Sequence, residues 1–184
     1  MSGVTQVLVL NGPNIARLGT REPDIYGATS YAGLVAECQS VGAKLGFSVD
    51  VRQTDSEAEL IGWLHEAADG KIPVVLNPAA FTHYSYALRD ACAQRTAPLV
   101  EVHLSNPAAR EEFRHNSVVS AVASGTIAGF GVDSYRLALF SLAGDAWAEN
   151  EDPKAIAEAP LAIEEAVSEA IDGSATPSIE SARS

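Results

Sequence analysis

The sequence predicts an α/β fold in which a five-stranded parallel sheet lies between two layers of helices. Short apolar runs of strand length alternate along the chain with longer segments whose apolar residues recur every three or four positions. Several of the apolar runs end in turn residues such as Asn, Gly and Pro. Parallel strands require long crossover connections, and the helical segments supply connections of that length. The alternation therefore favours a parallel sheet that is covered on both faces.

The first part of the chain predicts two strands and one helix. An apolar run at 6–10 ends in the turn sequence NGPN at 11–14, so we expect a buried strand there. Residues 15–28 have no periodicity and contain glycines and a proline, which predicts a mobile loop. Residues 29–45 have helical spacing, begin at a Thr or Ser cap and are followed by a glycine, which predicts a helix. A second strand is expected at 48–53.

The remaining elements continue the alternation. The sequence SEAE at 56–59 has the form of a capping box and begins a helix that ends near Gly70. The elements expected after it are a strand at 74–77, a helix at 85–94, a strand at 99–104, a helical turn at 108–113, a strand within 124–128 and a helix at 135–142. This order gives a flavodoxin-like three-layer sandwich.

The composition changes after Gly144, which divides the chain into two parts. We expect residues 1–144 to form one α/β domain, because this length is enough for a sizeable core. Residues 145–184 are rich in Ala, Glu, Ser and Pro and carry a net charge of −8 out of the total of −12. Such a segment is typical of an acidic extension that is partly helical or disordered, and we expect it to be a solvating appendage.

Composition and charge also exclude several classes of partner and location. The chain is 47% hydrophobic and 20% charged, as ordinary soluble proteins are. It contains no apolar run of membrane-spanning length and no secretory leader at its start, so we expect a cytoplasmic protein without a membrane partner. A net charge of −12 repels phosphate backbones and argues against nucleic acid as a partner. Cys38 and Cys92 lie on apolar helix stripes, so we expect free, buried thiols.

The carboxyl ends of the predicted strands are where a ligand should bind in an open parallel sheet. The first strand leads to Asn14, the third ends at Asn77, and the fourth carries Glu101, His103 and Ser105 near its end. These residue types predict a polar and mostly uncharged pocket, which suits a small oxygen-rich ligand.

Several chemistries are excluded because their residues are missing. The sequence has neither a phosphate-binding loop with a lysine nor a G-x-G-x-x-G after the first strand, so we expect no nucleotide cofactor. Asp69 stands where a zinc helix that starts at His65 would need its second histidine, so we expect no metal. Lys44 and Lys71 are predicted on an exposed helix face and in a turn, which argues against imine chemistry.

Acid–base catalysis is the chemistry that remains. Glu101 and His103 lie on the same face of a strand, where a carboxylate can orient a histidine and favour its protonated form. Tyr26 is the second candidate, in a loop that also carries Arg17 and Arg21.

Five motifs, taken in order, resemble the type II 3-dehydroquinate dehydratases. They are NGPN at 11–14, REPDIYG at 21–27, NPAA at 77–80, EVHLSN at 101–106 and REEFR at 110–114. The similarity spans residues 6–143, nearly the whole predicted domain. Members of this family convert 3-dehydroquinate to 3-dehydroshikimate without a cofactor or a metal, in the shikimate pathway or in quinate breakdown. The elimination is anti and proceeds through an enolate.

The resemblance implies roles for individual catalytic residues. Tyr26 would be the base that removes a proton from C2, and His103 the acid that protonates the departing C1 hydroxyl. Glu101 would hold His103, and Asn14 would bind the water that stabilises the enolate oxygen. Arg21 would lie beside Tyr26 on a closing lid and lower its pKa, with Arg110 as the next candidate for that task.

The resemblance also implies a set of substrate-binding residues and an oligomer. Asn77 and the backbone amides of Leu104 and Ser105 would hold the substrate carboxylate. His83 and Arg114 would reach its ring hydroxyls. Asp90 would reach the site of a neighbouring subunit, in a homo-oligomer of trimers assembled into a dodecamer.

Three sites differ from the commoner family pattern, and other functions stay open. Tyr84 replaces a usual threonine, Asn116 stands where a second histidine or a similar residue is frequent, and the pair at 133–134 replaces a turn that usually contains glycine. One alternative is another enzyme of a small carboxylic acid on this fold, although no G-x-S-x-G elbow is present. The other is a flavodoxin-like, non-catalytic module that binds a small ligand.

Overall fold

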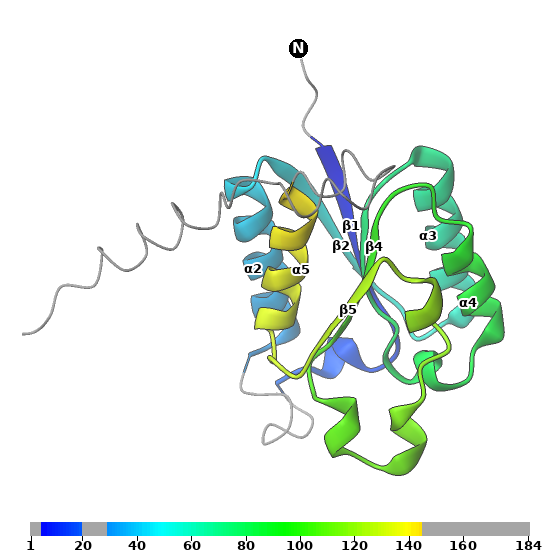
Figure 1. The fold of residues 1–184 in the computed structure, drawn as a ribbon. Helices are drawn as coiled ribbons and strands as arrows, with labels where there is room; N and C mark the ends of the chain where they lie inside the picture. The colour runs from blue at the N-terminus through cyan, green and yellow to red at the C-terminus, as the bar shows by residue number, and fades with distance from the viewer. Residues whose placement is uncertain (1–4, 20–28, 145–184) are drawn as a thin grey trace, which may run out of the picture. The chain divides into compact units, whose positions relative to one another are not determined.

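A computed structural model describes residues 5–19 and 29–144 of the chain, and its strands form one five-stranded parallel sheet (Figure 1). The strand order is β2-β1-β3-β4-β5. The bounds of the strands are β1 Thr5–Asn11, β2 Phe47–Gln53, β3 Val74–Asn77, β4 Leu99–His103 and β5 Gly125–Ala128. The sheet and its helices confirm the predicted flavodoxin-like α/β sandwich.

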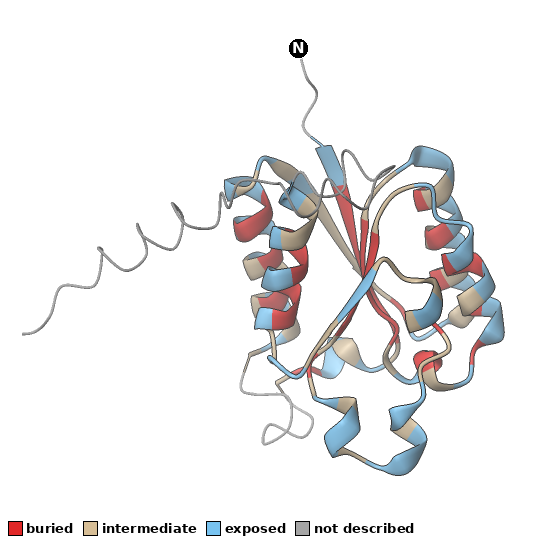
Figure 2. Cartoon of the chain, viewed as in Figure 1, coloured by how far each residue is buried: buried red, intermediate tan, exposed pale blue. Residues whose placement is uncertain are grey.

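Two layers of helices cover the sheet, one on each face (Figure 1). Helices α2 (Tyr31–Lys44) and α5 (Asp133–Ala143) cover one face, and α3 (Glu57–Gly70) and α4 (Tyr86–Ala93) cover the other. Successive residues of a strand point to opposite faces. Val7 and Val9 of β1 therefore pack under α2 and α5, whereas Leu8 and Leu10 pack under α3 and α4. Figure 2 shows the resulting buried stripes along the strands and inner helix faces.

Three helices begin close to their predicted first residues, and a serine caps each of them. The hydroxyls of Ser30, Ser56 and Ser85 each accept a hydrogen bond from the backbone N–H three residues later. Gly46 follows α2 with a φ of 79°, a left-handed conformation that glycine adopts without strain. These local signals explain why the predicted bounds agree closely with the observed helices.

Short 3-10 helices account for most of the differences from the prediction. Ile15–Arg17 forms one within the segment expected to be an irregular loop, and Ala79–His83 and Ser120–Val122 form two more. The predicted turn at 108–113 is two such helices, Pro107–Ala109 and Glu112–His115. A 3-10 helix of one turn has too few residues to show a periodic pattern, so sequence periodicity does not predict it.

Both cysteines are buried, as predicted from their helix stripes. Burial raises the pKa of each thiol, Cys38 and Cys92, to about 12. The thiols therefore stay protonated near neutral pH, where a neutral thiol packs as a small apolar group. In the ranges that the structure describes, no helix is both long and apolar enough to cross a membrane.

Candidate active site

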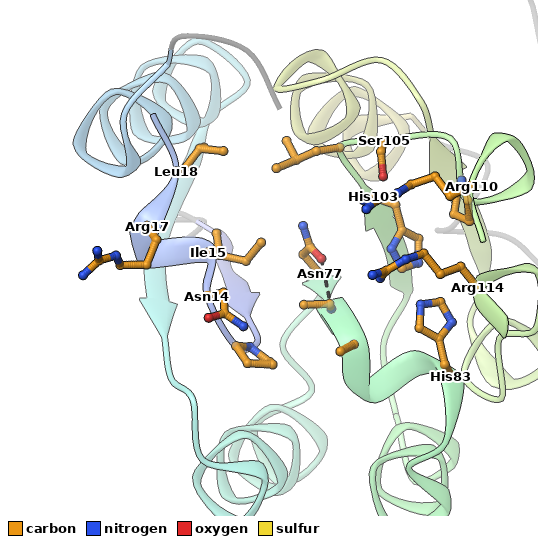
Figure 3. A pocket seen from close by; sticks show the side chains of 15 residues that line it. Asn14, Ile15, Arg17, Leu18, Asn77, His83, His103, Ser105, Arg110 and Arg114 are labelled. Atoms are coloured by element: carbon orange, nitrogen blue, oxygen red, sulfur yellow. Dashed lines mark hydrogen bonds between the residues drawn. The ribbon is translucent and has the colours of Figure 1, made fainter. Parts of the chain in front are cut away.

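A cavity lies at the carboxyl ends of β1, β3 and β4, where the topology of a parallel sheet places ligands (Figure 3). Seven of the predicted site residues line it: Asn14, Asn77, His83, His103, Leu104, Ser105 and Arg114. The other lining residues are Pro13, Ile15, Arg17, Leu18, Ala79, Ala80, Pro107 and Arg110. Motifs that are more than sixty residues apart in the sequence thus meet at one edge of the sheet.

Asn14 is held in place by its backbone. It has a φ of 69°, and its N–H donates to Asp55 Oδ1 at 2.8 Å. The loop before it also packs tightly, because a Cβ on Gly12 would lie 2.6 Å from the carbonyl oxygen of Pro78. Glycine at this position lets the loop after β1 approach the loop after β3, so the two loops are fixed against each other.

Asn77 is anchored by a buried tyrosine. Tyr135 donates its hydroxyl to Asn11 Oδ1 at 2.6 Å and accepts from Asn77 Nδ2 at 2.8 Å. Asn77 Oδ1 accepts from the N–H of Ala79 at 3.1 Å. Burial raises the pKa of Tyr135, so its hydroxyl keeps its proton and its donor role. An amide has two N–H groups, so Asn77 can still donate one to a ligand.

His103 and Glu101 form an ion-pair contact at the end of β4. His103 Nε2 lies 2.8 Å from Glu101 Oε1, and the carboxylate is completely buried while the histidine reaches the cavity. Burial alone raises the pKa of Glu101. Hydrogen bonds from His103, Ser120 and Thr82 outweigh that effect and hold the pKa below its ordinary value. Because Nε2 faces Glu101, the other ring nitrogen, Nδ1, is the one that can exchange a proton with a ligand.

Arginine and histidine side chains lie on the same side of the cavity as His103, across from Asn14 and Ile15 (Figure 3). His83 Nδ1 lies 2.8 Å from the carbonyl oxygen of Asn116. A carbonyl only accepts, so Nδ1 carries the proton and Nε2 is left for a ligand. Glu111 Oε2 lies 2.8 Å from Arg114 Nε and 3.4 Å from Arg110 Nε, which holds both guanidinium groups at this wall.

The cavity lining is basic although the chain is acidic. The lining residues named above include arginines and histidines but no Asp or Glu, whereas the whole chain has a net charge of −12. Arg17 lines the rim, with its guanidinium directed away from Asn77 (Figure 3). The prediction of a mostly uncharged pocket was therefore wrong. The arginines come from connecting segments, and the prediction considered mainly the strand ends.

Four of the predicted site residues are not among the residues that line this cavity. Tyr26 and Arg21 fall in 20–28, outside the residues that the structure describes. Asp90 lies on α4 with 74% of its side chain exposed, contacts Arg89 at 3.2 Å and does not line this cavity. Glu101 lies behind His103. Of the unusual positions, Tyr84 is exposed, and Ser134 Oγ donates to the carbonyl oxygen of His103 at 2.9 Å.

The residues that support the site are the ones that the sequence did not reveal. Asp55, Thr82, Ser117 and Ser120 contact site residues without lining the cavity. They lie in loops or 3-10 helices, and no sequence pattern links them to Asn14 or Glu101. In the described ranges, no group of three or more His, Cys, Asp or Glu side chains is arranged to hold a metal ion.

Comparisons with known proteins agree with this fold and site. The family model for dehydroquinase class II matches residues 5–143. The 3-dehydroquinate dehydratase of Salinispora tropica is 67% identical over 141 residues, which cover 77% of this chain and 99% of the relative. The enzyme of that name from Mycobacteroides abscessus is 60% identical over 133 residues, or 72% of this chain and 92% of the relative. The crystal structure of type II dehydroquinase from Propionibacterium acnes has a TM-score of 0.75 at 59% identity and covers 76% of this chain and 96% of that one.

A parallel sheet with a cavity at its carboxyl edge is the architecture of an α/β enzyme that acts on a small molecule. The matched model spans more than half of the chain, and the chain therefore belongs to the class II dehydroquinase family. It is an enzyme of that class, a hydro-lyase of the type II 3-dehydroquinate dehydratases.

Proposed function

We propose that this chain removes water from 3-dehydroquinate to give 3-dehydroshikimate, by anti elimination through an enolate and without a cofactor. The reaction is a step of the shikimate pathway. The observation that carries the proposal is the His103–Glu101 pair, which opens into a cavity lined by basic side chains. A general acid and an anion-binding wall are what the dehydration of a hydroxy acid requires.

The substrate carboxylate binds at the end of β4 in this proposal. The backbone N–H groups of Leu104 and Ser105 and the remaining amide proton of Asn77 are the donors to it. His83 and Arg114, which line the same cavity, contact the ring hydroxyls. Support comes from the positions of these residues, which all line the same cavity.

His103 acts as the general acid. Its Nε2 donates to the ionised Glu101, which stabilises the imidazolium form, and Nδ1 delivers a proton to the C1 hydroxyl as it departs as water. Asn14 binds the water that stabilises the enolate oxygen. Its place at the cavity wall, fixed by Asp55, supports this role.

Tyr26 acts as the base at C2 and must be activated for this. A tyrosine with a pKa near 10 is about three units from being half ionised at pH 7, a deficit of roughly 4 kcal/mol. A guanidinium within about 4 to 6 Å typically lowers the pKa of an acid by about 1 to 3 units. Arg21 supplies this charge in the proposal, and Arg110 at the cavity wall is the second candidate.

Ultraviolet absorbance of the full chain with 3-dehydroquinate tests the proposed reaction. The conjugated enone of 3-dehydroshikimate should accumulate at an unchanged rate with a chelator present and after borohydride treatment. A flat trace from folded protein would contradict the proposal and favour a non-catalytic, flavodoxin-like ligand-binding module. Loss of activity with chelator or borohydride would instead point to a metal or an imine.

The active form in this proposal is a homo-oligomer in the cytoplasm, in which trimers assemble into a dodecamer. Asp90 completes the site of a neighbouring subunit. Its exposure on α4, away from the cavity of its own chain, supports this role. Light scattering should give the mass of twelve chains, and Asp90→Ala should weaken turnover without altering the fold. A monomer with full activity would contradict it.

A further inference from the structure

We propose that Thr82, Ser117 and Ser120 are positioning residues that keep Glu101 ionised and aligned with His103. The inference rests on the proposed function, in which His103 is the general acid. None of the three hydroxyl residues lines the cavity, so they would act on the reaction only through Glu101.

The three hydroxyls surround the buried carboxylate. Thr82 Oγ1 lies 2.5 Å from Glu101 Oε1, and Ser120 Oγ lies 2.5 Å from Oε2. Ser117 Oγ bridges the two oxygens at 3.1 and 3.2 Å. With His103 Nε2 at 2.8 Å from Oε1, every neighbour can donate to Glu101. A carboxylate offers about four acceptor sites, and Thr82, Ser120 and His103 occupy three of them. Ser117 has one hydroxyl proton, which it can donate either to Glu101 or to Thr82, 2.7 Å away.

The hydrogen-bond partners of Ser117 indicate which groups around Glu101 donate. Its oxygen already accepts from the backbone N–H of Val119 at 3.2 Å and from that of Ser120 at 2.9 Å. Both of its lone pairs are thus occupied, so in its 2.7 Å contact with Thr82 it cannot also accept. The proton of Thr82 therefore goes to Glu101. This pattern suits a charged carboxylate, which accepts only, better than a protonated one.

The hydroxyls are built into the fold on separate segments. Thr82 lies in the 3-10 helix after β3 and is 1% exposed, and Ser120 begins the 3-10 helix before β5. The N–H of Val118 donates to the carbonyl oxygen of Thr82 at 2.8 Å, which joins these two segments behind β4. The arrangement is therefore fixed by backbone contacts as well as by the side chains.

Few charged groups contact Glu101, so hydrogen bonds from the hydroxyls are needed to keep it ionised. Within the described residues, His103 is the one cationic partner in contact with Glu101. The thiol of Cys92 on α4 also faces Glu101, and its raised pKa of about 12 keeps it neutral. Arg110, Arg114 and His83 line the same cavity as His103. A buried carboxylate without such donors would take up a proton and cease to stabilise the imidazolium.

The test compares Ser120→Ala and Thr82→Val with the full wild-type chain. Each variant removes one donor from the ionised Glu101, so the pKa of Glu101 should rise. We expect kcat to drop about tenfold, since hydrogen bonds to charged groups are the stronger kind. KM should change little, and the acid limb of the kcat profile, where Glu101 takes up a proton, should move to higher pH. Thr82→Ser keeps the hydroxyl and should restore wild-type behaviour.

Ser124→Ala is the matched control. Its hydroxyl accepts from the N–H of Leu99 at 3.0 Å, so it supports the other end of the same strand without touching Glu101. It should leave the pH profile in place even if it lowers the melting temperature. The proposal is overturned if Ser120→Ala and Thr82→Val keep the wild-type acid limb, whatever their stability.

A second measurement separates this inference from the proposed function. Carbon NMR titration of the Glu101 carboxyl group needs no turnover, so it applies even if the wild type fails to dehydrate 3-dehydroquinate. A higher Glu101 pKa in Ser120→Ala than in Ser124→Ala supports the positioning role. Equal values in the two variants reject it.

Discussion

Glu101 is the residue on which the chemistry of the site depends most. It is a fully buried carboxylate whose pKa stays below the ordinary range because its hydrogen bonds outweigh the effect of burial. A group with a depressed pKa stabilises the folded state above its unfolded pKa, and that stability is lost as pH falls through the folded value. Glu101 therefore supports the fold at neutral pH and, in the proposed mechanism, the acid His103.

Replacing Glu101 by Gln tests this dual role. The substitution keeps the size of the side chain but removes the charge, so the imidazolium of His103 loses its partner. We expect kcat to fall by about tenfold to a hundredfold, with the alkaline limb of the pH profile displaced to lower pH. The variant should also lose less stability than wild type on acidification below about pH 4. Unchanged pH dependence of both kcat and unfolding would contradict this account.

Tyr135 supplies a second prediction at the residue scale. Tyr135→Phe keeps the buried ring but removes the hydroxyl that joins Asn11 to Asn77. Leaving these buried amides without a partner should cost about 1 to 3 kcal/mol of unfolding free energy. KM should rise because Asn77 is no longer fixed at the cavity. Urea denaturation and steady-state kinetics measure the two effects, and wild-type KM in the variant would argue against the role of Asn77.

At the scale of elements, the site depends on how closely the loops after β1 and β3 approach. Gly12→Ala would place a methyl group 2.6 Å from the carbonyl oxygen of Pro78, which is backbone and cannot move aside easily. We expect a loss of about 1 to 3 kcal/mol in stability and weaker substrate binding, as Asn14 shifts with its loop. Denaturant unfolding and KM together check this.

Gly62→Ala is the control for that substitution. Gly62 is exposed on α3, and a Cβ there would have no neighbour within 4 Å. Alanine in an exposed helix should stabilise by about 0.5 to 1 kcal/mol. If Gly12→Ala behaved like Gly62→Ala, the close packing of the two loops would be unimportant for the site.

Strands, long helices and their caps could be predicted from the sequence because each leaves a local signal. β1 is an unbroken buried run, and Ser30, Ser56 and Ser85 cap helices through contacts only three residues long. His103 and Glu101 share a strand face, so their contact was also predictable. Ser117 and Thr82 are 35 residues apart in irregular segments, and only the folded chain brings them together.

At the scale of the whole molecule, charge is distributed unevenly. The chain has a net charge of −12, yet arginine and histidine side chains line the cavity. A basic cavity in an acidic molecule selects a small anion from solution by local attraction. Seven of the residues that the family motifs predicted line this cavity, whereas the overall composition alone would have pointed to the opposite charge.

Ionic strength tests that local attraction. The Debye length falls from about 30 Å to about 8 Å between about 0.01 M and 0.15 M salt. KM for the anionic substrate should therefore rise several-fold over this range, while kcat at saturation stays nearly constant. Arg114→Gln should raise KM at low salt and flatten the dependence. A KM that is independent of salt in the wild type would show that the arginines contribute no long-range attraction.

The most direct test of the account compares enone formation from 3-dehydroquinate by the wild type and by His103→Asn at saturating substrate. The wild type should produce the enone. The variant should bind the substrate but turn it over about 10² to 10⁴ times more slowly, as loss of a general acid requires. If His103→Asn kept near wild-type turnover, or the folded wild type produced no enone, the central claim that the His103–Glu101 pair catalyses this dehydration would be contradicted.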